Sequence, residues 1–141
     1  VAVFTLSFMV LRSYTGGYHS DSRVFCYLGS NLVLLVPVYT QAVFYKTSLA
    51  CLLAVLLVSA GIIFLLSPMH SKNRKLDKEE QKHFGRKARL IAALELAVLG
   101  ILWHAGQIPY AYAVYTGICI TALFMLIGKA QLWIQSHTEN R

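Results

Sequence analysis

Residues 49–66 read LACLLAVLLVSAGIIFLL, a run that contains no charged side chain. A helix needs roughly 20 mostly apolar residues to cross the hydrocarbon core of a bilayer. Because a backbone in lipid must satisfy its own hydrogen bonds, helices are the usual spanning form. The run, taken with its neighbours as residues 47–67, therefore predicts a membrane-spanning helix.

The composition of the whole chain agrees with a membrane location. Hydrophobic residues make up 57% of the 141 positions, whereas about 45 to 50% is typical of soluble domains. Other apolar windows predict three more full spans and, at the start, the end of a helix that begins before the given sequence; they are residues 24–45, 90–106 and 108–128, and residues 1–11. We expect an all-α, polytopic transmembrane helical bundle in one domain over residues 1–141, with about four full spans plus the end of an N-terminal span. Pro37 predicts a kink in the helix that contains it.

Basic residues gather between the predicted spans at 47–67 and 90–106. Residues 68–89 hold eight of the 13 Lys and Arg residues, against three acidic residues. Excess positive charge marks cytoplasmic loops, so this segment is expected inside the cell. Alternating the spans outward from it also places residues 12–23 on the cytoplasmic side of a multi-pass protein of the cell membrane. Because topology and anionic headgroups explain the net charge of +7, we expect the lipid bilayer as a partner and no nucleic acid.

Residues 12–26, RSYTGGYHSDSRVFC, join two apolar runs and hold the best candidates for chemistry, His19 and Cys26. Residues 20–22 are good N-cap residues, so the next helix should begin there and carry Cys26 in its first or second turn. The positive end of the helix dipole would favour the thiolate, which is the nucleophilic form. Seven residues along one helix would separate the pair by roughly 10 Å, so His19 must precede the helix and fold back over it. Gly16 and Gly17 supply the backbone freedom for that fold.

Each candidate also has an inert interpretation. Buried free cysteines are common and usually unreactive, and Arg12 is either a topogenic charge or a partner for a carboxylate or oxyanion. The basic segment either touches lipid headgroups or docks an acidic peptide. Glu95, inside a predicted span, either pairs with Arg89 or another helix, or serves a transporter as a proton or ion site. The His and Cys residues show no metal-ligand spacing, so we expect neither a metal nor a cofactor.

Two motifs resemble those of the accessory gene regulator B (AgrB) family, membrane peptidases that mature autoinducing quorum-sensing peptides. The order Arg12, Gly16, Gly17, His19 and Cys26 is similar to the family signature R-x-x-A-G-G-x-H-A-x-x-x-x-x-C. The second motif, a proline followed by N-R-K-L-D-K-E-E, resembles the family's P-x-x-x-x-N-K-P-L-D-x-E-E and lies at residues 68–80. The chain departs from these patterns without losing a chemically active group, at Thr15, Ser20 and Lys75.

The resemblance implies a cysteine endopeptidase that cleaves a quorum-sensing pro-peptide near its C-terminus and promotes thiolactone or lactone ring closure. Cys26 would attack an AgrD-like precursor peptide, and His19 would activate the thiol and protonate the leaving amine. Supporting roles fall to Arg12, Gly16 and Gly17, whereas Lys72, Arg74 and Lys75 would bind the acidic tail of the precursor. The resemblance also implies a homodimer. The alternatives are a non-catalytic polytopic membrane protein, such as an export or scaffold subunit, and a small transporter that uses Glu95.

Overall fold

The computed structural model describes residues 2–15, 23–67 and 78–141, and these ranges fold into helices with no strand among them. The all-α prediction is therefore confirmed. The helices, in chain order, are α1 Ala2–Thr15, α2 Arg23–Lys46, α3 Leu49–Leu66, α4 Lys78–His104 and α5 Ile108–Glu139. Two of the described helices are long and apolar enough to cross a membrane, namely α3 and α5.

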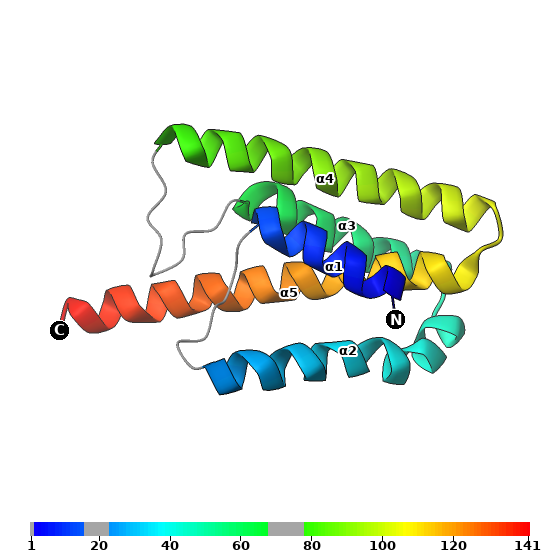
Figure 1. Ribbon diagram of the computed structural model, residues 1–141, viewed down its shortest axis with the longest axis horizontal. Coiled ribbons are helices and arrows are strands. Elements are labelled where there is room, and N and C mark those ends of the chain that lie inside the picture. Colours follow the sequence, from blue (N-terminus) through cyan, green and yellow to red (C-terminus); the bar gives the residue numbers. More distant parts are fainter. Residues whose placement is uncertain (1, 16–22, 68–77) are drawn as a thin grey trace.

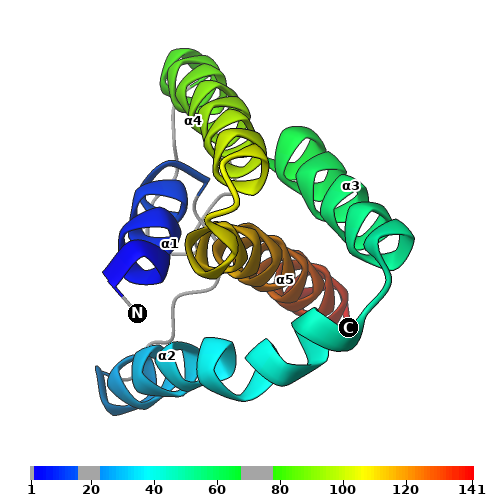
Figure 2. The ribbon, with the colours of Figure 1, turned by 90° about the vertical axis from the view of Figure 1, so that its right-hand side faces the viewer.

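Helix α5 occupies the middle of the bundle, and Figure 2 shows the other four helices arranged around it. Successive helices run in alternating directions, so the end of α1, the start of α2, the end of α3 and the start of α4 lie toward the same end (Figure 1). We call this the loop end. The opposite end, the turn end, carries the two short connections at residues 47–48 and 105–107.

Two helices match their predicted windows closely and two run well past them. The bounds of α2 and α3 lie within two residues of the predicted 24–45 and 47–67. Helix α4 begins at Lys78, twelve residues before the predicted window at 90–106, so part of the basic segment 68–89 is helical and continues directly into the apolar span. Helix α5 continues eleven residues beyond the predicted end at Gly128. At about 1.5 Å per residue, α5 is about 48 Å long, more than the ~30 Å of a hydrocarbon core.

The turn between α4 and α5 follows from one glycine. Gly106 has a φ of 73°, a left-handed conformation that a glycine adopts without steric cost. Its amide donates to the carbonyl of Trp103, and the amide of Gln107 donates to the carbonyl of Leu102. This pair of bonds is a Schellman motif, which satisfies carbonyls that the helix end leaves open. Pro109 then stands in the first turn of α5, where a missing amide hydrogen costs nothing.

Helices α1 and α5 approach each other closely at Gly117. A Cβ atom added at Gly117 would lie 2.8 Å from Ser7 Oγ and 3.3 Å from Ser7 Cβ. Phe4 of α1 is fully buried and belongs to one apolar cluster with Ala113, one turn before Gly117. A small residue such as Gly117 lets the backbones of two membrane helices approach closely. In lipid, dispersion and hydrogen bonds, and not the hydrophobic effect, hold such helices together.

Helix α2 is held to α5 through its half nearer the turn end. The hydroxyl of Tyr112 donates to the carbonyl of Pro37 and lies within hydrogen-bonding distance of Thr40 Oγ1. Phe44 packs against two rings of α5, with centroid distances of 4.7 Å to Tyr112 and 5.3 Å to Tyr115. Figure 2 shows that α2 curves along its length, as a proline inside a helix predicts.

We predict that Gly117→Ala lowers the free energy of unfolding by about 1 to 3 kcal/mol, because the new methyl group overpacks the contact with Ser7. Gly61→Ala is the matched control, since a Cβ atom there meets nothing within 4 Å. That variant should be neutral or raise the unfolding free energy by up to ~1 kcal/mol through helix propensity. Reversible unfolding of both purified variants in mixed micelles measures the difference. Equal stabilities would contradict the close approach.

Candidate functional site at the loop end

The residues predicted for catalysis lie only partly in the region that the structure describes. His19, Gly16 and Gly17 lie outside the described residues, as do the predicted substrate-binding residues Lys72, Arg74 and Lys75. For Arg12 and Cys26 the structure gives the backbone. Arg12 is in the last turn of α1, and Cys26 is the fourth residue of α2.

The start of α2 determines the electrostatic setting of Cys26. Because α2 begins at Arg23, Cys26 is in its first turn. Backbone N–H groups of a first helical turn have no intrahelical acceptor and carry a partial positive charge. A cysteine at a helix start generally favours the thiolate form, and the reactivity of a cysteine at neutral pH rises with its thiolate fraction.

The fold also sets which chain segments can meet Cys26. The last turn of α1 and the first turn of α2 lie at the loop end, together with Leu66 at the end of α3 and Lys78 at the start of α4 (Figure 1). The described helix ends that flank residues 16–22 and 68–77 therefore share one end of the bundle. The first turns of α4 add exposed cations at this end, namely Lys78, Lys82, Arg86 and Lys87.

Glu95 pairs with another helix. Its side chain is only 8% exposed, and Ser7 Oγ of α1 donates to Glu95 Oε2 over 2.7 Å. Arg89, which the sequence offered as a partner, instead donates from Nε to the carbonyl of Phe64 over 3.3 Å. A transporter site would need Glu95 in a wet cavity, so its burial against Ser7 favours the role of joining α1 to α4.

This pair lies on the helix that leads into the candidate site. Ser7 precedes Thr15, the last residue of α1, by eight residues, or about 12 Å along the helix axis. Ser7 also contacts α5 at Gly117, so a single side chain joins three helices. A charged or polar group within an apolar span signals a need for a partner, but the sequence alone could not identify Ser7 among the possible partners.

The remaining thiols lie away from the first turn of α2. Cys51 is exposed near the start of α3, at the turn end, and Cys119 is half-buried in α5. In the part of the chain that the structure describes, no three His, Cys, Asp or Glu side chains gather as a metal site requires. The two cysteines are therefore useful as controls for the role of Cys26.

The model of the family "Accessory gene regulator B" matches residues 1–127. The chain belongs to this family. AgrB proteins act in accessory gene regulation, a form of quorum sensing. The match includes both motifs that the sequence analysis identified, at residues 12–26 and 68–80, so the predicted resemblance is confirmed.

A curated relative supports this assignment. The chain is 26% identical over 121 residues to the accessory gene regulator protein B of Staphylococcus intermedius, a match that covers 86% of this chain and 62% of the relative. The chain thus spans less than two thirds of the length of that AgrB protein. No solved structure matches the chain.

We predict that Ser7→Ala lowers the free energy of unfolding by about 1 kcal/mol, because it leaves the buried carboxyl of Glu95 without this donor. A double-mutant cycle with Glu95→Ala should give a coupling energy of about 0.6 kcal/mol, the average measured for hydrogen bonds between membrane helices, and at most about 1.7 kcal/mol. Ser136→Ala, which removes a hydroxyl bonded within α5, is the control and should change stability by less than ~0.5 kcal/mol. A coupling energy of zero would show that the pair contributes nothing.

Proposed function

We propose that this AgrB-family chain is a membrane cysteine endopeptidase that cleaves a quorum-sensing pro-peptide near its C-terminus and promotes closure of a thiolactone or lactone ring. The family match carries the proposal, because it runs through the ordered motif residues Arg12, Gly16, Gly17, His19 and Cys26. The backbone supports it, since Cys26 is in the first turn of α2. A helix start next to a histidine is a setting that produces reactive thiolates.

The first half of the proposed reaction is acyl transfer to Cys26. His19 takes the thiol proton, and the sulfur attacks the carbonyl carbon of the scissile peptide bond. The C–N bond breaks, His19 returns the proton to the leaving amine, and the C-terminal segment of the precursor departs. The N-terminal segment stays on the enzyme as a thioester.

The second half closes the ring without water. A cysteine thiol or serine hydroxyl of the bound precursor gives its proton to His19 and attacks the thioester carbonyl, and the bond to the Cys26 sulfur breaks as Cys26 leaves as thiolate. When the attacking group is a thiol, one thioester replaces another, so the step needs little free energy. Hydrolysis would destroy the intermediate, and a site at the membrane edge that excludes water favours cyclisation.

The chain length before α2 permits the geometry that this reaction needs. Four residue steps separate His19 from Arg23, and an extended chain spans at most ~3.3 to 3.6 Å per residue. Cys26 lies only about 4.5 Å further along the helix axis. A fold of residues 16–22 over the first turn can therefore bring the imidazole within the ~3 Å that proton transfer requires.

The proposal includes a location and partners. We place the loop end on the cytoplasmic side of a multi-pass protein with about four full spans, as the excess of Lys and Arg in residues 68–89 supports. Lys72, Arg74 and Lys75 are proposed to attract the acidic tail of an AgrD-like precursor, and the active form is proposed to be a homodimer. Attraction between opposite charges mainly accelerates and orients association.

We predict that Cys26→Ala abolishes precursor cleavage and that His19→Ala slows it by about 10²- to 10⁴-fold, the usual contribution of a general acid–base. Cys51→Ala is the matched control, because it removes an exposed thiol at the turn end, and should leave processing unchanged. Mass spectrometry of the peptide released on co-expression with the precursor measures each variant. Normal cleavage by both Cys26→Ala and His19→Ala would favour a non-catalytic polytopic protein.

We predict that reversing the charges of Lys72, Arg74 and Lys75 to Glu raises the KM for the precursor about 10-fold or more at low salt, with kcat nearly unchanged. Reversal of Lys82, Arg86 and Lys87, three exposed cations of α4, changes the net charge equally and is the matched control. A specific dock requires the first triple variant to lose more affinity than the second. Equal losses of affinity in the two triple variants would show that the effect depends only on the overall charge of the protein.

A further inference from the structure

Helix α1 packs one face against α4 and α5, and Figure 2 shows it beside both. Phe4, Ser7 and Leu11 lie on this face, because residues three and four positions apart share one side of a helix. Phe4 and Leu11 are fully buried, and Ser7 is only 8% exposed. Ser7 therefore places a hydroxyl between two apolar residues of the buried face.

Ser7 is held from two directions. Its hydroxyl donates to Glu95 Oε2 of α4 over 2.7 Å, and a Cβ atom added at Gly117 of α5 would lie 2.8 Å from Ser7 Oγ. Apolar contacts are non-directional, and in lipid they favour one helix face only weakly over another. A hydrogen bond needs its two heavy atoms about 3 Å apart and well aligned. The bond from Ser7 to Glu95 therefore selects one rotation and one height of α1 against α4.

Stability alone does not account for the carboxyl of Glu95 in this apolar layer. A carboxyl inside a membrane span costs free energy. Two apolar side chains of similar shape would hold the helices about as well as the hydrogen-bonded pair does. The best-attested use of a buried polar group is to fix the register of one helix against another. Ser7 and Glu95 have the geometry for this use.

The rotation of α1 matters for the candidate site because α1 leads into it. Residues 16–22 connect Thr15, the last residue of α1, to Arg23, the first residue of α2. A rotation by one residue, about 100° on a radius of about 2.3 Å, would move the backbone at Thr15 by about 3.5 Å. Misplacing a catalytic group by about 1 Å can slow a reaction about 10²-fold. A rotated α1 would therefore start the segment that carries His19 from the wrong place.

We propose that Ser7 and Glu95 are positioning residues for the peptidase reaction. Their hydrogen bond sets the rotation of α1, and that rotation sets the point from which residues 16–22 carry His19 toward Cys26. Both side chains act through the backbone of α1 and not by contact with the precursor. The inference rests on the proposed function and goes beyond it, because it gives a carboxyl inside a span a part in processing at the loop end.

The test removes the hydrogen bond and keeps the packing. In the double variant Ser7→Ala/Glu95→Leu, apolar side chains replace both partners, so Tm should not fall. Purified variants in liposomes are supplied with the AgrD-like precursor, and mass spectrometry follows its processing. We expect kcat to fall about 10-fold or more with KM nearly unchanged, because the lost contact affects the reacting groups and not precursor binding. Glu95→Gln keeps an oxygen that accepts from Ser7, and should retain at least about half of the parent kcat.

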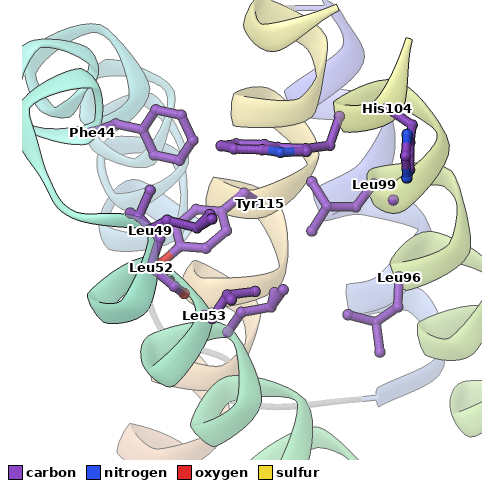
Figure 3. Close-up of a pocket in the computed structure, with 11 residues that line it drawn as sticks. Phe44, Leu49, Leu52, Leu53, Leu96, Leu99, His104 and Tyr115 are labelled. Carbon is purple, nitrogen blue, oxygen red and sulfur yellow. Dashed lines mark hydrogen bonds between the residues drawn. The ribbon is translucent and has the colours of Figure 1, made fainter. Parts of the chain in front are cut away.

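Tyr115→Phe is the matched control, because it also removes a hydrogen bond between two helices. Tyr115 lines an apolar cavity of about 360 Å³ between α3 and α4, near the turn end (Figure 3). Its hydroxyl donates to the carbonyl of Leu52 over 3.1 Å. This bond joins α5 to α3 and not to α1, so Tyr115→Phe should lower Tm and leave kcat unchanged.

A folded double variant with the parent kcat would overturn the positioning role. Equal losses of kcat in Glu95→Gln and in the double variant would also overturn it, because the amide keeps the acceptor. If the double variant does not fold, Ser7→Ala decides, and a kcat no lower than that of Tyr115→Phe contradicts the proposal. Failure of the peptidase function itself is distinguishable, because the parent protein would then show no processing that depends on Cys26.

Discussion

The bundle depends on how closely the other helices can approach α5. In lipid, apolar side chains gain little by leaving one apolar surrounding for another, so close packing and hydrogen bonds between helices determine which faces meet. Gly117 permits the close approach of α1, and at the same contact Ser7 donates a hydrogen bond to the carboxyl of Glu95. One small residue on α5 therefore allows a polar link between α1 and α4, and without that link Glu95 would lose a hydrogen-bond donor in an apolar layer.

The sequence predicted the helices best where hydropathy and helix formation end at the same residues. Lys46 and Ser67 stop both the apolar run and the helix, so α2 and α3 agree with their windows. In α4 and α5 the helix continues where hydropathy falls, because the charged flanks contain good helix formers such as Glu, Lys, Gln and Ala. In α4 and α5 the span read from hydropathy is therefore shorter than the helix that contains it.

In the candidate site, too, some features could be predicted from neighbouring residues in the sequence, whereas others depend on how the helices pack. Local capping chemistry predicts a helix start near residues 20–22, which lie outside the described residues, and the described helix α2 begins at Arg23. The partner of Glu95 is 88 residues away in sequence, and only the packing of α1 on α4 and α5 selects it. The approach of His19 to Cys26 stays a prediction, because it depends on how residues 16–22 fold over the helix start.

Helix α2 contacts α5 through residues in its second half, whereas Cys26, the proposed nucleophile, lies in its first turn. From the middle of α2 to its last turn, Val33, Pro37 and Phe44 are buried against the other helices, and Tyr112 fixes the backbone at the proline. Toward the loop end, Val24 and Leu28 are 66% and 56% exposed on either side of Cys26 along the sequence. The proposed peptidase would need apolar surface at the start of α2 that the core of the bundle does not cover. Val24 and Leu28 supply exposed apolar side chains in the first turns of α2, and the contacts of Pro37 and Phe44 with α5 lie outside the region where the proposed precursor would bind.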